Sequence, residues 1–285
     1  MTSHFITTHR GKFHYRTYGN PANPVLVAIH GYPQSSYCWK EIAEFLEGEY
    51  YVITPDIRGM GDSERTLDKK HYSKDELGKD IILILDDLKI DQFYLAGHDW
   101  GSGVAQEIAH QITPRIKKLI TLNFPIIHNE IGKLKAYEKL SERLFAPFWY
   151  QFFQRMPHLA EKFLAGNEEF WIRFTMRGKH PFAEEGILEY VRCHEIPNSI
   201  TTYANLYRTM KYDMERWASP EFVNRKLPLD VLVIHGALDT VIVKEYYENI
   251  ENCFDKVKME FLDSGHFVCD ELPKEVAELI KGYLK

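Results

Sequence analysis

The chain has 285 residues, of which 45% are hydrophobic, enough to build the core of one or two globular domains and too many for a disordered or fibrous protein. Its 35 Lys and Arg residues are outnumbered by 41 Asp and Glu residues, and the net charge of −6 leaves no excess of cations for binding nucleic acid. Apolar runs such as Val25–Ile29 and Ile81–Leu85 are far shorter than the roughly 20 residues that cross a bilayer, so we expect no membrane partner.

The start of the chain, Met1-Thr-Ser-His-Phe5, lacks the basic segment and apolar run of a secretory signal, so we expect a cytoplasmic protein. The four cysteines form no CxxC pair and are expected to be free thiols. The sequence also lacks an HExxH motif and the glycine-rich phosphate-binding motifs. We therefore expect no metal and no cofactor.

Short apolar runs alternate with amphipathic segments along much of the chain. Residues 75–90, for example, carry apolar side chains at helical spacing. Uninterrupted apolar strands are typical of a parallel sheet that is covered on both faces, so the pattern predicts an α/β fold with a mostly parallel, doubly wound sheet. The predicted strands are Val25–Ile29, Tyr51–Thr54, Phe93–Ala96, Leu119–Leu122, Val231–Ile234 and a weaker one at Lys258–Leu262.

The alternation stops near Pro125 and resumes at about Arg225. The region between is rich in aromatic residues and in helix-like stretches such as Leu159–Ile172. We interpret it as a helical cap inserted over the C-terminal edge of the sheet. The predicted organisation is a core formed by residues 1–127 and 218–285, with a cap at 128–217.

The strand at Phe93–Ala96 runs into Gly97-His-Asp99-Trp-Gly101, and a helix is expected from about Val104. This is the nucleophile-elbow pattern GxSxG with Asp99 in place of serine. Small flanking residues permit the sharp turn that holds the central residue in a strained conformation. Asp99 is therefore a candidate nucleophile, and the alternative is a helix N-cap.

Two later strands lead into polar residues that complete the set. Val231–Ile234 is followed by Asp239, and Lys258–Leu262 is followed by His266. The chain order of nucleophile, acid and base is the one expected for an α/β hydrolase, with each residue just past the end of a strand.

Five motifs carry a resemblance to a known family: HGYP at 30–33, DIRGMGDS at 56–63, GHDWG at 97–101, HGALD at 235–239 and SGHF at 264–267. On these motifs the chain resembles the epoxide hydrolase and haloalkane dehalogenase branch of the α/β-hydrolase superfamily over nearly its whole length. The resemblance implies that Asp99 is the nucleophile, His266 the base and Asp239 its acid partner. It also implies an oxyanion hole formed by the backbone N–H groups of Tyr32 and Trp100. Asn123 stands where some relatives place the acid, but an amide cannot supply the charge.

A carboxylate that attacks an sp3 carbon forms an alkyl ester, which water activated by His266 then hydrolyses. An epoxide oxygen leaves as an alkoxide that needs a proton, and epoxide hydrolases carry two cap tyrosines for this purpose. The context of Tyr150 resembles that of the first, and Asn205-Leu-Tyr207-Arg resembles the Asn-Trp-Tyr-Arg of the second. The expected reaction converts a small hydrophobic epoxide and water to a vicinal diol, in a pocket to which Trp100, Trp149 and Phe153 contribute.

A haloalkane dehalogenase is the main alternative, because it shares the nucleophile and because the indole N–H of Trp100 could bind a halide. However, many dehalogenases carry Asn or Glu where this chain has Tyr32, and they give the paired tyrosines no role. A fluoroacetate dehalogenase would place arginines after the nucleophile, and Trp100–Val104 contains none. A non-catalytic ligand-binding protein of this fold would not need the intact Asp99, Asp239 and His266. A serine esterase is disfavoured because Asp99 takes the place of the serine.

Overall fold

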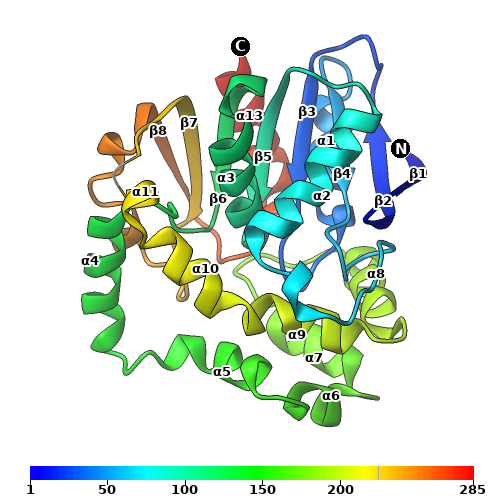
Figure 1. Cartoon of the computed structure of the whole chain (residues 1–285), viewed down its shortest axis with the longest axis vertical. Helices are drawn as coiled ribbons and strands as arrows, with labels where there is room; N and C mark the ends of the chain where they lie inside the picture. The colour runs from blue at the N-terminus through cyan, green and yellow to red at the C-terminus, as the bar shows by residue number, and fades with distance from the viewer. Residues whose placement is uncertain (224) are drawn as a thin grey trace.

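The computed structural model describes residues 1–223 and 225–285, and its centre is a single eight-stranded sheet (Figure 1). The strand order is β1-β2-β4-β3-β5-β6-β7-β8, in which β2 runs antiparallel to β1 and β4 and all other neighbours are parallel. The predicted mostly parallel α/β sheet is confirmed. The strands are β1 (Thr2–Thr8), β2 (Gly11–Tyr18), β3 (Val25–Ile29), β4 (Tyr51–Pro55), β5 (Phe93–His98), β6 (Ile116–Leu122), β7 (Leu227–Gly236) and β8 (Phe254–Leu262).

Helices cover both faces of the sheet, as a doubly wound fold requires. On the near face in Figure 1, α2 (Lys74–Asp87) packs against α3 (Trp100–Ile112). Behind the sheet, α1 (Lys40–Leu46) packs against α13 (Pro273–Leu284). The short helix α12 (Val268–Glu271) precedes α13. Because each central strand is buried on both faces, its residues are almost uniformly apolar.

The hairpin of β1 and β2 was not predicted from the sequence. β1 is an edge strand whose side chains are exposed or half-buried, so it lacks an apolar face. β2 buries polar residues, which interrupt the apolar pattern expected of a buried strand. His14 is bonded to Asp56, and Arg16 is paired with Glu189.

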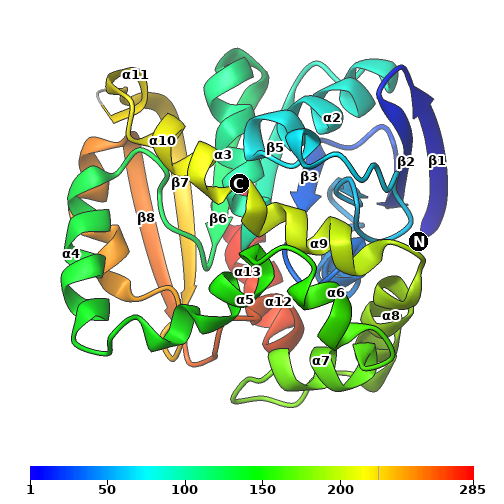
Figure 2. The same ribbon diagram turned by 60° about the horizontal axis from the view of Figure 1, so that its bottom comes forward.

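Within its described residues, the connection from β6 to β7 contains helices and no strand, and Figure 2 shows α9 and α10 crossing in front of the sheet. The prediction of one helix over Leu159–Ile172 is wrong, because Gly166 adopts a φ of 79° between two shorter helices. The helices are α4 (Glu130–Ser141), α5 (Trp149–Arg155), α6 (Leu159–Leu164), α7 (Glu168–Thr175), α8 (Glu184–Glu195), α9 (Ser199–Arg208), α10 (Met210–Trp217) and α11 (Pro220–Val223).

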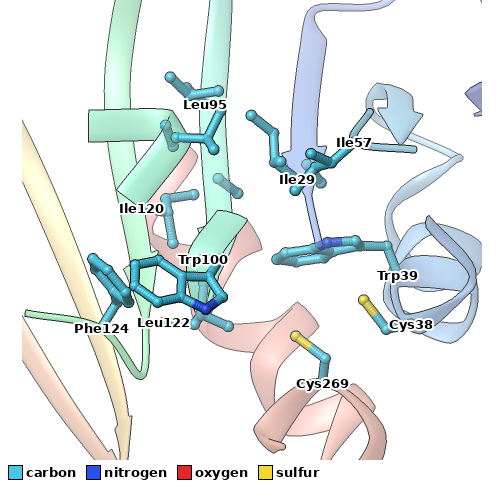
Figure 3. Close-up of a cluster of buried hydrophobic side chains, with 14 of the residues drawn as sticks. Ile29, Cys38, Trp39, Ile57, Leu95, Trp100, Ile120, Leu122, Phe124 and Cys269 are labelled. Carbon is cyan, nitrogen blue, oxygen red and sulfur yellow. The ribbon is translucent and has the colours of Figure 1, made fainter. Parts of the chain in front are cut away.

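The core lies directly behind the C-terminal ends of the central strands. Ile29, Leu95 and Ile120 from β3, β5 and β6 are fully buried and gather near Trp39 and Trp100 (Figure 3). All four cysteines are free and buried. Among the described helices, none has the length and apolarity needed to pass through a bilayer.

Candidate active site

Asp99 lies in a sharp turn between β5 and α3, with φ 50° and ψ −130°. A positive φ is unfavourable for a residue with a side chain, so the surroundings must hold the turn in place. A Cβ on Gly97 or Gly101 would lie closer than 3.0 Å to backbone atoms, of Gly101 and of Ile29 respectively. The glycines of the motif are therefore required by the close approach of the chain to itself.

Asp99 occupies the N-cap position of α3, but its side chain makes no capping hydrogen bond to the helix. Instead, its Oδ1 accepts a hydrogen bond from the backbone N–H of Tyr32 at 2.8 Å. Trp100 is the first residue of α3, where the helix itself provides no acceptor for the backbone N–H. Both amides expected for an oxyanion hole thus belong to segments that adjoin the Asp99 carboxylate.

His266 lies between the two carboxylates that the sequence assigned to it. Its Nδ1 is 2.6 Å from Oδ2 of Asp239, and its Nε2 is 3.3 Å from Oδ2 of Asp99. Asp99, Asp239 and His266 follow β5, β7 and β8, whose C-terminal ends meet at one edge of the sheet. The structure therefore brings the three predicted residues into one hydrogen-bonded row.

Asp239 is held as a carboxylate by four donors. Its Oδ1 accepts the backbone N–H groups of Val241 and Ile242, and its Oδ2 accepts the side-chain N–H of Asn123 at 2.8 Å. Burial alone would raise the pKa of Asp239, but the nearby His266 and these hydrogen bonds lower it to about 2. Asn123 therefore orients the acid from the strand end where some relatives place it.

The charge of His266 depends on the same carboxylates. Burial alone would lower its pKa, but attraction to Asp239 and Asp99 outweighs burial and raises the pKa of His266 to about 10. At neutral pH the resting site therefore holds an imidazolium between two carboxylates.

Tyr150 on α5 and Tyr207 on α9 face Asp99 from the cap side. Their ring centroids are 5.8 Å apart at an interplanar angle of 89°. Burial raises the pKa of both phenols, and the charge of Asp99 adds to the effect, so both remain protonated at neutral pH. Two O–H donors thus share a cavity with the carboxylate.

Two cavities, of about 520 Å³ and about 380 Å³, meet at Asp99 and Tyr150, which line both. Trp149 lines the larger and Trp100 lines the smaller. The prediction that Phe153 lines the pocket is wrong, because Phe153 borders neither of these cavities. It packs behind the wall against Trp149 and Trp171, at ring distances of 6.3 and 5.7 Å.

A buried lysine that no sequence motif marks connects α2 to α9 and α10. Nζ of Lys74, on α2, donates to Oδ2 of Asp213 at 2.8 Å and to the backbone oxygen of Leu206 at 2.6 Å. It also lies 4.0 Å from the ring centroid of Trp100. Lys74 therefore links Trp100, the residue after Asp99, to α9, the helix that carries Tyr207.

A second buried network supports the loop of His266. Nε2 of His98 donates to the backbone oxygen of His266 at 2.8 Å, and Nδ1 of His98 lies 2.9 Å from the amide oxygen of Gln34. Gln34 also bonds to Asp270, which accepts the hydroxyl of Tyr190 on α8. Burial raises the pKa of Asp270 to about 7.

The hydroxyl of Tyr32 has two donors on the cap side, Gln154 at 2.8 Å and Trp171 at 2.5 Å. These contacts fix the loop whose N–H reaches Asp99. Neither donor had been predicted, since no local motif marks them.

His14, Asp56 and Asp62 are close enough together to hold a cation among the described residues. Asp56, however, already accepts hydrogen bonds from His14 and from the backbone N–H groups of Ser36 and Asp62. The cluster therefore attaches the loop at 56–63 to β2 by hydrogen bonds.

Comparison with known proteins agrees with this architecture. A sequence model of the family described as alpha/beta hydrolase fold matches residues 24–273. The soluble epoxide hydrolase of Corynebacterium sp. (strain C12) is 27% identical, covering 98% of this chain and 95% of that protein. Epoxide hydrolase 4 of Mus musculus is 28% identical, covering 96% and 76%. The solved structure of epoxide hydrolase CorEH has a TM-score of 0.83 at 27% identity and covers 98% of this chain and 96% of its own.

Proposed function

The chain belongs to the α/β-hydrolase fold family and is a hydrolase, and from this premise we propose that it opens epoxides to vicinal diols through an alkyl ester on Asp99. One observation carries the proposal: a carboxylate paired with a His–Asp couple faces two tyrosine hydroxyls across a single cavity. A carboxylate nucleophile needs the His–Asp couple to hydrolyse its ester. Two neutral O–H donors suit an oxygen that leaves as an alkoxide.

In the first step, Asp99 attacks a ring carbon of the epoxide, a new C–O bond forms and the strained C–O bond of the ring breaks. Tyr150 and Tyr207 donate hydrogen bonds to the oxirane oxygen, and one of them gives its proton to the developing alkoxide. The imidazolium of His266 restores that proton. The step therefore ends with a hydroxyalkyl ester, two neutral tyrosines and a neutral imidazole.

Esterification also removes the negative charge of Asp99, which lowers the pKa of His266 and makes the ring a base. His266 then takes a proton from water as the water oxygen attacks the ester carbonyl. The N–H groups of Tyr32 and Trp100 stabilise the tetrahedral oxyanion. Collapse releases the diol and restores ionised Asp99 and protonated His266, so the cycle is balanced.

We assign the helices within residues 128–217 to a cap, and residues 1–127 and 218–285 to the hydrolase core. The cap carries both tyrosines over Asp99, so its placement decides whether the oxirane oxygen meets them. The substrate is a small hydrophobic epoxide, and the second reactant is water.

A single turnover in water labelled with oxygen-18, with enzyme in excess over a small aryl epoxide, tests the proposal. The diol from this first turnover should be unlabelled, because its new oxygen comes from Asp99, and the label should appear in the peptide that contains Asp99. The Asp99→Asn protein, as a control, should form no diol. Label in the first diol would mean that water attacks the epoxide directly, which would overturn the ester mechanism.

A further inference from the structure

Large apolar side chains are exposed on and next to α5, α6 and α7, which neighbour one another on the outer side of the cap (Figure 2). Leu144 is 88% exposed, Phe170 68% and Phe163 61%. Exposed apolar groups of this size, when clustered, mark interaction sites. We call the following residues the apolar cap face: Leu144, Trp149, Phe152, Met156, Phe163 and Phe170.

Three aromatic members of this face, Trp149, Phe163 and Phe170, are linked through ring contacts. The ring of Trp149 lies 6.1 Å from that of Phe174, which stacks on Phe170 at 5.9 Å. On its other side, Trp149 reaches Phe163 through Phe153, in steps of 6.3 and 6.4 Å. Trp149, Phe163 and Phe170 are therefore not scattered singly.

Helix α5 shows why this patch calls for a partner. Trp149, Phe152 and Met156 are exposed at helical spacing. Tyr150 and Gln154, on the opposite side, serve the candidate site. A helix that is apolar on its solvent side as well as its inner side is normally covered by something else.

Two members of the apolar cap face also line the cavities. Trp149 lines the larger cavity, Phe152 lines the smaller one, and both side chains are exposed. A second copy of the chain seated here would cover these cavity-lining side chains. A lipid surface would instead bring a dissolved hydrophobic substrate next to them, so docking on it would deliver substrate to the cavities.

The charged residues near the apolar cap face indicate which kind of surface it binds. Arg143, Arg155 and Lys162 adjoin Leu144, Met156 and Phe163 in the sequence, and none of the three cations forms an ion pair within the described part of the chain. The two acids of this stretch, residues 142–163, are occupied: Glu142 pairs with Lys139, and Glu161 pairs with Arg208. On α7, Glu169 pairs with Arg173, and Glu168 forms no ion pair within the described residues. A chain with a net charge of −6 thus leaves three unpaired cations against one unpaired acid among the residues that neighbour the face in the sequence.

We propose that the apolar cap face docks on an anionic lipid surface, with its aromatic side chains in the headgroup boundary and the three cations at lipid phosphates. The delivery of substrate by docking rests on the proposed function, whereas the docking itself does not.

The sequence predicted no membrane partner because its apolar runs are short. Short runs exclude a segment that crosses a bilayer, but they do not exclude a protein that docks on its surface. A patch assembled from separate helices leaves no such run.

Vesicle co-sedimentation of the full chain tests the proposal, using the Asp99→Asn protein so that binding is measured independently of any reaction. Three cations predict that vesicles with roughly 30% phosphatidylglycerol bind about a hundredfold more tightly than pure phosphatidylcholine at low salt. The triple variant Leu144→Ser/Phe163→Ser/Phe170→Ser should bind at least about tenfold more weakly. None of these three side chains lines either cavity, so the triple change in the active protein should leave turnover of a water-soluble epoxide intact, which also shows that it folds.

A matched control changes three similarly exposed apolar residues elsewhere, Phe45→Ser/Leu67→Ser/Phe261→Ser, and should keep wild-type binding. The variant Arg143→Gln/Arg155→Gln/Lys162→Gln should lose the preference for anionic vesicles. Absent or charge-independent binding, or equal weakening by the control triple, would overturn the proposal. So would sedimentation as a dimer that the cap-face triple converts to a monomer, since the face would then be a contact between copies.

Discussion

Replacing Asp239 with Asn should lower the pKa of His266 by roughly 1 to 3 units, because it removes the nearer of two carboxylates. Oδ2 of Asp239 is 2.6 Å from the imidazole, whereas Asp99 is 3.3 Å away on the other nitrogen. The starting value is about 10. The variant ring should therefore titrate at about 7 to 9, which corresponds to a loss of about 1.4 to 4 kcal/mol of attraction.

The same change should alter how stability depends on pH. The folded-state pKa of His266 lies above its unfolded value of 6.5, so its contribution to stability is complete below pH 6.5 and is lost as the pH rises through about 10. In Asp239→Asn this loss should be smaller and should be complete at a lower pH, because only the folded-state pKa has moved towards 6.5. Urea unfolding at about pH 6 and about pH 10 should show a smaller difference between the two pH values for the variant than for the wild type.

The assay is an NMR titration of nitrogen-15-labelled histidine, with His266→Gln used to assign the signal. Asp263→Asn is the matched control, because this carboxylate lies three residues from His266 but is exposed and paired with Lys179. The control should leave the pKa of His266 unchanged. An unchanged pKa in Asp239→Asn, or an equal fall in Asp263→Asn, would refute the assignment of Asp239 as the partner.

Three further changes test other parts of the site. Tyr207→Phe should slow formation of the ester by roughly a hundredfold and leave its hydrolysis unaffected, as measured by rapid quenching; equal slowing of both steps would contradict the donor role. Lys74→Met should lower the free energy of unfolding, measured by urea titration, by about 3 to 5 kcal/mol, because it leaves the buried carboxylate of Asp213 without its cation. The double change Lys74→Met/Asp213→Leu should recover most of this loss. Gly101→Ala should push α3 away from the end of β3 and lower the free energy of unfolding by about 1 to 3 kcal/mol. It should also make the ester accumulate. A variant with wild-type stability and turnover would argue against the close approach of Gly101 to the backbone of Ile29.

The parallel core could be predicted because its strands are buried on both faces and read as uninterrupted apolar runs. Asp99, Asp239 and His266 could be located because each comes at most four residues after the end of a strand, where parallel strands bring their ends together. The strand before His266, β8, was the weaker prediction because its residues are largely exposed or half-buried. Glycines at 97 and 101 added a local constraint that the structure explains by backbone contact.

The remaining features depend on contacts between segments far apart in the chain. Lys74 appears to be a surface lysine until Asp213, 139 residues later, packs against it. Gln154 and Trp171 lie on different cap helices that meet only at Tyr32. Phe153, one of the aromatic residues between the two halves of the core, was expected in the pocket, but its side chain packs against Trp171 and Phe163 behind the cavity wall.

The most direct test of the central claim is the intact mass of His266→Gln after mixing with a small epoxide. The variant keeps the nucleophile but lacks the base, so the ester should accumulate and the mass should rise by that of the whole epoxide. This gain should be absent when Asp99→Asn is added to the variant. A gain only with a haloalkane, equal to the alkyl group without its halogen, would make the chain a dehalogenase, and no gain with either reagent would contradict covalent catalysis by Asp99.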